Sequence, residues 1–145
     1  MKRRAALLSC AFALLVTQSG QARNPALQAQ LQCEPEAAPG RILCELRTQA
    51  AAGTLVWSDA LVVRAPAFAR PLRSRFAAQL GTSNVGPGVA WAKLALVASQ
   101  PGQGELELLA RGVVCRVGPS GESCTPEFVA VTAAVLVGRA GPAAP

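Results

Sequence analysis

The side chains that could carry out catalysis are few in this chain of 145 residues, and histidine is absent. There is also no tyrosine, and Asp59 is the single aspartate. Without an imidazole there can be no Ser-His-Asp or Cys-His site and no histidine acid or base. Ser120 lies in Gly-Pro-Ser-Gly-Glu, which differs from the Gly-x-Ser-x-Gly nucleophile turn. We therefore expect a protein that is not an enzyme and uses no cofactor.

Two weaker catalytic arrangements are alternatives. Glu105 and Glu107 would share one face of a strand at a separation of about 7 Å, and paired carboxylates can hydrolyse glycosidic bonds. A solvated strand face explains the same spacing. Lys93 could activate a serine, although no pattern identifies that serine. A hydrolase that uses Glu105 and Glu107 or a Ser–Lys pair is our least favoured hypothesis.

Basic side chains gather in the middle of the chain. The segment 60–104 has no acidic residue, yet it carries Arg64, Arg70, Arg73 and Arg75 in addition to Lys93. A solvated basic face is one interpretation. The other is a patch that binds an anionic surface or a polyanion through these four arginines. Nucleic acid is not an expected partner, because no platform of stacking aromatic residues is identifiable.

Trp57 and Asp59 form a second candidate site. An aspartate inside a strand pattern is unusual, and beside a tryptophan it could contact a ligand. For Asp59 we favour a strand-end or edge carboxylate near solvent that pairs with an arginine. For Trp57, and also for Trp91, we favour an apolar anchor in the core.

The first residues predict export. Lys2, Arg3 and Arg4 precede the apolar run 5–16, and small residues precede a cleavage position after Ala22. This is the plan of a secretory signal peptide over residues 1–22, and the apolar run is too short for a transmembrane helix. Three of the six net positive charges lie in this segment. We expect a secreted or periplasmic protein with no transmembrane helix in the mature chain.

The four cysteines that follow predict two disulfides, which suit an oxidising compartment. They are Cys33, Cys44, Cys115 and Cys124. Because the chain lacks histidine and neither pair has the close spacing of zinc ligands, we expect no metal site.

The segment from Glu105 to Val137 predicts a hairpin around the turn Gly118-Pro119-Ser120-Gly121. If Gly118 faces Gly121, facing residue numbers sum to 239, and Cys115 faces Cys124 on a non-hydrogen-bonded pair that a disulfide can span. Pro119 disfavours the type I′ turn that two-residue loops prefer, so a longer or bulged loop is the alternative. Cys33 and Cys44 flank a second hairpin and face the same side, and we favour a disulfide between them.

The remaining segments also read as strands. Residues 27–33 alternate strictly between apolar and polar, and further strands are expected over 42–48, 54–65 and 89–99. The segment 71–80 fits a strand or a helix, and we favour the strand. The pattern predicts an all-β domain over 23–137, a two-layer antiparallel β-sandwich of about seven strands, with a flexible tail over 138–145.

A resemblance to immunoglobulin domains suggests an alternative disulfide pairing. Cys44, Trp57 and Cys115 are spaced like the Cys…Trp…Cys core of immunoglobulin domains, which would pair Cys44 with Cys115 and Cys33 with Cys124. The tyrosine corner of those domains is missing, so the resemblance is to their architecture alone.

Our leading hypothesis is an exported, non-catalytic β-sandwich with a binding or structural role in the periplasm or outside the cell. Its partner would be a protein or an envelope component. Binding of an anionic surface through Arg64, Arg70, Arg73 and Arg75 is the second hypothesis.

Overall fold

The computed structural model describes residues 25–81 and 88–139. Within these ranges the chain forms β-strands and no helix. The signal peptide predicted over 1–22 and residues 140–145 of the predicted tail lie outside them, as does most of the segment 81–88, whose glycines and polar residues indicate a loop. No helix of the described residues is long and apolar enough to cross a membrane.

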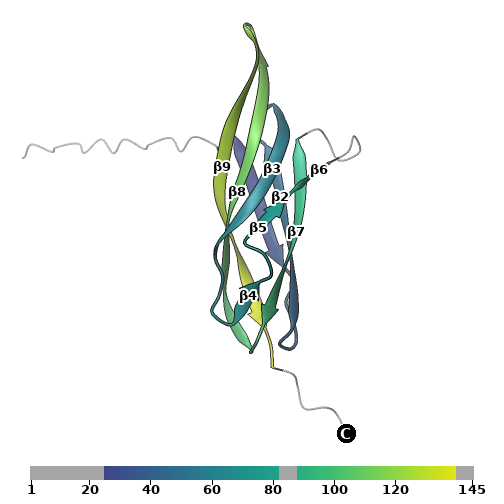
Figure 1. The fold of residues 1–145 in the computed structure, drawn as a ribbon, viewed down its shortest axis with the longest axis vertical. Coiled ribbons are helices and arrows are strands. Elements are labelled where there is room, and N and C mark those ends of the chain that lie inside the picture. The colour runs from purple at the N-terminus through teal and green to yellow at the C-terminus, as the bar shows by residue number, and fades with distance from the viewer. Residues whose placement is uncertain (1–24, 82–87, 140–145) are drawn as a thin grey trace, which may run out of the picture.

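Two antiparallel sheets pack face to face, which confirms the predicted all-β sandwich (Figure 1). The five-stranded sheet has the order β1-β2-β7-β4, with β6 also paired to β7, and the four-stranded sheet has the order β5-β3-β8-β9. The path β1-β2-β7-β4 and the trio β3-β8-β9 resemble the ABED and CFG sheets of an immunoglobulin-type sandwich, to which β5 and β6 are added. The strands are β1 (Leu27–Cys33), β2 (Arg41–Ala50), β3 (Thr54–Arg64), β4 (Ala69–Pro71), β5 (Arg75–Ala77), β6 (Gln79–Leu80), β7 (Val89–Ala98), β8 (Gly102–Gly118) and β9 (Gly121–Val137).

The core lies between the sheets and consists of the apolar residues that alternate along each long strand. Ile42, Leu96, Leu106, Leu108 and Val135 have no exposed surface. Burying a leucine or isoleucine side chain stabilises the fold by about 1.5–3 kcal/mol, and these residues come from both sheets. The core therefore holds the two layers together.

The register predicted for the β8–β9 hairpin is confirmed throughout its length. Every facing pair, from Gly102 with Val137 to Gly118 with Gly121, sums to 239. The loop is the two residues Pro119 and Ser120, so the alternative of a longer or bulged loop is wrong. Gly121 permits the tight turn because it adopts a φ of 112°, which other residues rarely do.

Both predicted disulfides are present, and the immunoglobulin-type pairing of Cys44 with Cys115 is wrong. Cys33 faces Cys44 and Cys115 faces Cys124, each with Cα atoms 4.0 Å apart. The second disulfide lies where β3 begins, because Thr54, the first residue of that strand, faces Cys115. Beyond it the β8–β9 tip projects past the rest of the sandwich (Figure 1).

The segment 71–80 is neither a helix nor one continuous strand. It divides between β4 and β6 of one sheet and β5 of the other. Only Phe76 of its large apolar residues is buried, while Leu72 and Leu80 are exposed. The segment between Pro101 and Gly104, whose proline and glycines indicate a turn, lies mostly in β8. Its Gly102 leaves room for the ring of Phe68, which a Cβ atom would approach to 2.5 Å.

Candidate functional site

Asp59 lies in the middle of the four-stranded sheet. It faces Ala77 of β5 on one side and Arg111 of β8 on the other, and only 1% of its surface is exposed. The expectation of an edge carboxylate near solvent was therefore wrong, because β3 is a central strand. The expected pairing with an arginine is confirmed, and Asp59 has two such partners.

The two arginines hold Asp59 as a carboxylate. Arg111 donates from Nε to Oδ1 at 2.8 Å and from Nη2 to Oδ2 at 2.5 Å, and Arg75 donates from Nε to Oδ2 at 2.6 Å. Burial by itself would raise the pKa of Asp59, but the hydrogen bonds and charges of Arg111 and Arg75 outweigh it and lower the pKa below its usual value. We call these three residues the arginine–aspartate cluster.

Of the two arginines, Arg111 has its side chain held more firmly, because it makes two hydrogen bonds with Asp59 and Arg75 makes one. Its forked contact with Asp59 fixes the plane of the guanidinium, and the hydrogen bond to Asp59 raises the pKa of Arg111. The backbone carbonyl of Arg111 also accepts a hydrogen bond from the buried Ser58 hydroxyl at 3.0 Å. Ser58 Oγ lies 3.0 Å from Thr48 Oγ1 of the opposite sheet. Arg111 is thus tied to the core through its backbone and to Asp59 through its side chain.

Trp57 faces outward beside the cluster. A register shift between Leu55 and Trp57 breaks the alternation of β3, so the ring projects away from the core and is 42% exposed. The guanidinium carbon of Arg111 lies 5.8 Å from the ring centroid. The expectation that Trp57 anchors the core was therefore wrong, because the bulge changes the face on which it lies. Gly112 makes room for this arrangement, since a Cβ there would approach Leu55 to 2.7 Å.

Phe128 of β9 completes the site. It faces Arg111 across the β8–β9 ladder, and 74% of its surface is exposed. On the neighbouring pairs Val113 faces both Trp57 and Pro126. We define the aromatic face as Trp57, Arg111, Val113, Pro126 and Phe128. Phe128 was not among the predicted site residues, although the sum of 239 places it opposite Arg111.

The four predicted anion-binding arginines lie on different parts of the molecule. Arg75 belongs to the arginine–aspartate cluster, and Arg64 pairs with Glu107 at 3.3 Å. Arg70 lies on β4 of the five-stranded sheet. Arg73 lies between β4 and β5, at the rim of a hollow. The structure thus gives carboxylate partners to two of the four, and their joint role in binding an anion stays a prediction.

The two hydrolase alternatives concern different sheets. Glu105 and Glu107 lie on β8 of the four-stranded sheet, where Glu107 forms the ion pair with Arg64. Lys93 lies on β7 of the other sheet, and half-buried Trp91 is on the same strand. Trp91 is stacked against Arg47 on the outer side of that sheet, so the expectation of a core anchor was wrong for it as well.

A cluster of Cys115, Glu122 and Cys124 places three ligand-type atoms close together. Both sulfurs are bonded to each other, so neither supplies the thiolate that a metal ion binds.

No family model matches the chain, and no curated protein matches it. Among solved structures it is similar to a Porphyromonas gingivalis W83 protein of unknown function, with 15% identity and a TM-score of 0.44 over 83% of this chain and 51% of that one. It is also similar to AggA, the major subunit of aggregative adherence fimbriae type I from Escherichia coli, with 13% identity and a TM-score of 0.37 over 77% of this chain and 95% of AggA. The chain therefore spans about half the length of the first of these proteins.

Proposed function

We propose that this protein is an exported, non-catalytic binding module that recognises a partner protein through the aromatic face. One observation carries the proposal. Trp57 and Phe128 are exposed on either side of Arg111, and the buried carboxylate of Asp59 holds that guanidinium in place.

The composition of the aromatic face suits a protein partner. The energetic centres of protein interfaces are enriched in tryptophan and arginine, and their cores in aromatic residues. Here such side chains stand on adjacent strands of one sheet, and Arg111 is ordered by Asp59. Little conformational entropy is therefore lost when a partner binds. The arginine–aspartate cluster has two guanidinium groups for one carboxylate, so the fitting partner offers a carboxylate next to apolar side chains.

The two disulfides support export. Such bonds persist in oxidising compartments and are rare in the cytosol. Together with the signal peptide predicted over residues 1–22, they support a location in the periplasm or outside the cell. We expect the partner there as well.

Photo-crosslinking in the producing cells tests the proposal. A benzophenone side chain would replace Phe128 on the aromatic face or, as a matched control, Val97, an exposed apolar residue on the other sheet. We expect a crosslinked product of defined mass from position 128 and none from position 97. The Arg111→Lys substitution should reduce its yield, because lysine cannot form the forked contact with Asp59.

Equal products from both positions, or none from position 128, would refute the aromatic face as the binding site. A product with twice the mass of the mature chain would show that a second copy occupies the aromatic face, and that result would also overturn the proposal of a separate partner.

Mass spectrometry of the secreted chain would test cleavage after Ala22.

A further inference from the structure

The outer side of the five-stranded sheet carries mainly glutamine side chains, unlike the aromatic face. Gln30, Arg47, Trp91 and Gln79 face one another in sequence across β1, β2, β7 and β6. Gln28 faces Gln49 on one neighbouring level, and Gln32 faces Glu45 on the other. We call the set Gln28, Gln30, Gln32, Arg47, Gln49 and Trp91 the glutamine face. We propose that this face is a second binding site and that its ligand is an oligosaccharide chain.

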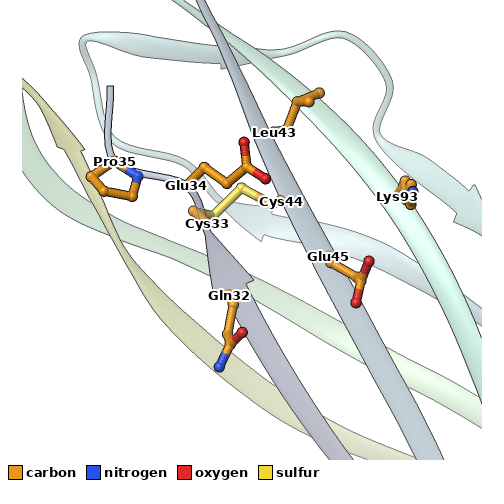
Figure 2. A pocket seen from close by; sticks show the side chains of 8 residues that line it. All are labelled: Gln32, Cys33, Glu34, Pro35, Leu43, Cys44, Glu45 and Lys93. Carbon is orange, nitrogen blue, oxygen red and sulfur yellow. A yellow bond between two sulfur atoms is a disulfide. The ribbon is translucent and has the colours of Figure 1, made fainter. Parts of the chain in front are cut away.

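The glutamine face is hollowed along its length. Three hollows of about 50, 200 and 360 Å³ lie in a row, and neighbouring hollows share lining residues. The first and second share Gln30 and Arg47, and the second and third share Gln32 and Glu45. Figure 2 shows the third, where side chains from β1, β2 and β7 surround the Cys33–Cys44 disulfide. A row of connected hollows fits an extended ligand better than a compact one.

The chemistry of these side chains matches hydroxyl groups. A glutamine amide offers two donors and one carbonyl acceptor, a guanidinium offers donors, and a carboxylate offers acceptors. A sugar hydroxyl is both a donor and an acceptor, so it can use all three. Glu34 and Glu45 line the largest of the three hollows, and their negative charges oppose a polyphosphate. The face therefore favours a saccharide over a nucleic acid.

Trp91 lies at the centre of the row, and it gives the apolar ring surface on which the C–H face of a sugar can stack. At present Arg47 covers that surface, with its guanidinium carbon 5.2 Å from the ring centroid. The Arg47 Nε atom is buried and, within the described part of the chain, makes no hydrogen bond. The contact with the Trp91 ring therefore holds Arg47 in this position, without help from a hydrogen bond at Nε. A saccharide that displaces Arg47 from the ring would give the Nε–H group an oxygen acceptor.

Trp91 also provides the measurement. The chain has two tryptophans, Trp57 and Trp91. The Trp57→Phe variant therefore leaves Trp91 as the sole tryptophan, and the substitution lies on the other sheet. The labelled mature protein would first be applied to an array of neutral and acidic oligosaccharides, and a bound glycan would then be titrated into the Trp57→Phe variant. We expect a saturable change in Trp91 emission.

The Gln30→Ala/Gln32→Ala double variant should bind the glycan about tenfold more weakly, because two sets of amide hydrogen bonds are lost. Thr132→Ala, an exposed position on the four-stranded sheet, is the matched control and should bind like the parent. Circular dichroism would confirm that each variant is folded. An acidic glycan should bind less tightly as salt is added, since Arg47 and Lys93 would then contribute charge, whereas a neutral one should not.

Absence of binding across the array would overturn the oligosaccharide site, as would equal affinity in the Gln30→Ala/Gln32→Ala variant. Neither result affects the proposed protein partner, because the crosslinking experiment probes the other sheet.

Discussion

Replacing Asp59 tests the arginine–aspartate cluster most directly. Asp59 is 1% exposed and accepts three hydrogen bonds from two guanidinium groups. A hydrogen bond to a charged group contributes about 1.5–3 kcal/mol, and loss of one partner of a fully buried ion pair costs about 3–5 kcal/mol. Here the side chains of Arg75 and Arg111 are 61% and 34% exposed, so water replaces part of what they lose. We therefore expect Asp59→Asn to lower the free energy of unfolding by about 2–3 kcal/mol at neutral pH.

The pH dependence follows from the lowered pKa of Asp59. A carboxyl group whose pKa is lower in the folded state stabilises the fold above its unfolded-state pKa, which is about 3.9. That stabilisation disappears as the pH falls through the folded-state pKa. The stability difference between the parent and Asp59→Asn should therefore be constant above about pH 5 and shrink below about pH 4.

Urea unfolding followed by circular dichroism between pH 7 and pH 3 would measure both effects. Arg111→Ala should destabilise the protein more than Arg75→Ala, because Arg111 makes two of the three contacts with Asp59 and Arg75 makes one. A stability difference for Asp59→Asn that is the same at pH 3 and pH 7 would refute the ion pair as its cause. So would a larger effect of Arg75→Ala than of Arg111→Ala.

Three further predictions concern the hairpin and its surroundings. Replacing Cys115 and Cys124 together by alanine opens a loop with a sequence separation of 9 and should cost about 2–3 kcal/mol in urea unfolding, a difference that should vanish under reducing conditions. Gly53→Ala should destabilise by at least about 1 kcal/mol more than Gly40→Ala, because both glycines have positive φ but only at Gly53 would a Cβ collide with the Cys115 carbonyl oxygen; equal thermal melting temperatures would contradict this. Phe128→Ala should change stability by no more than about 0.5 kcal/mol, because the ring is 74% exposed, and a larger loss in urea unfolding would mean that the ring supports the fold.

The hairpin was predictable because its pattern is local and redundant. One turn and one pair of cysteines gave the same sum, and the strand faces followed from the two-residue period. The disulfides then followed, since Cys115 and Cys124 face each other with Cα atoms 4.0 Å apart. The strand 27–33 was equally clear, because it alternates without interruption and matches β1.

The segment 71–80 was not predictable in the same way. Its residues serve both sheets in turn, so neither a helical nor a strand period applies to the whole of it. Leu72 donates its backbone N–H to Ala95 of one sheet, whereas Ser74 offers its carbonyl to Val62 of the other. Such contacts are between residues distant in the sequence, and local pattern carries no signal for them.

The aromatic face depends on a β-bulge in β3, which inserts one extra residue between Leu55 and Trp57 and interrupts the alternation of buried and exposed residues. If β3 alternated regularly from the buried Leu55, then Trp57 and Asp59 would point into the core and Ser58 would point to solvent. The shift between Leu55 and Trp57 reverses this parity. Ser58 and Ala60 become buried, whereas Trp57 projects outward and Asp59 lies beneath the two arginines. The same bulge thus removes a carboxylate from the apolar core and brings a tryptophan beside Arg111, which is why the unusual aspartate and the exposed ring occur together.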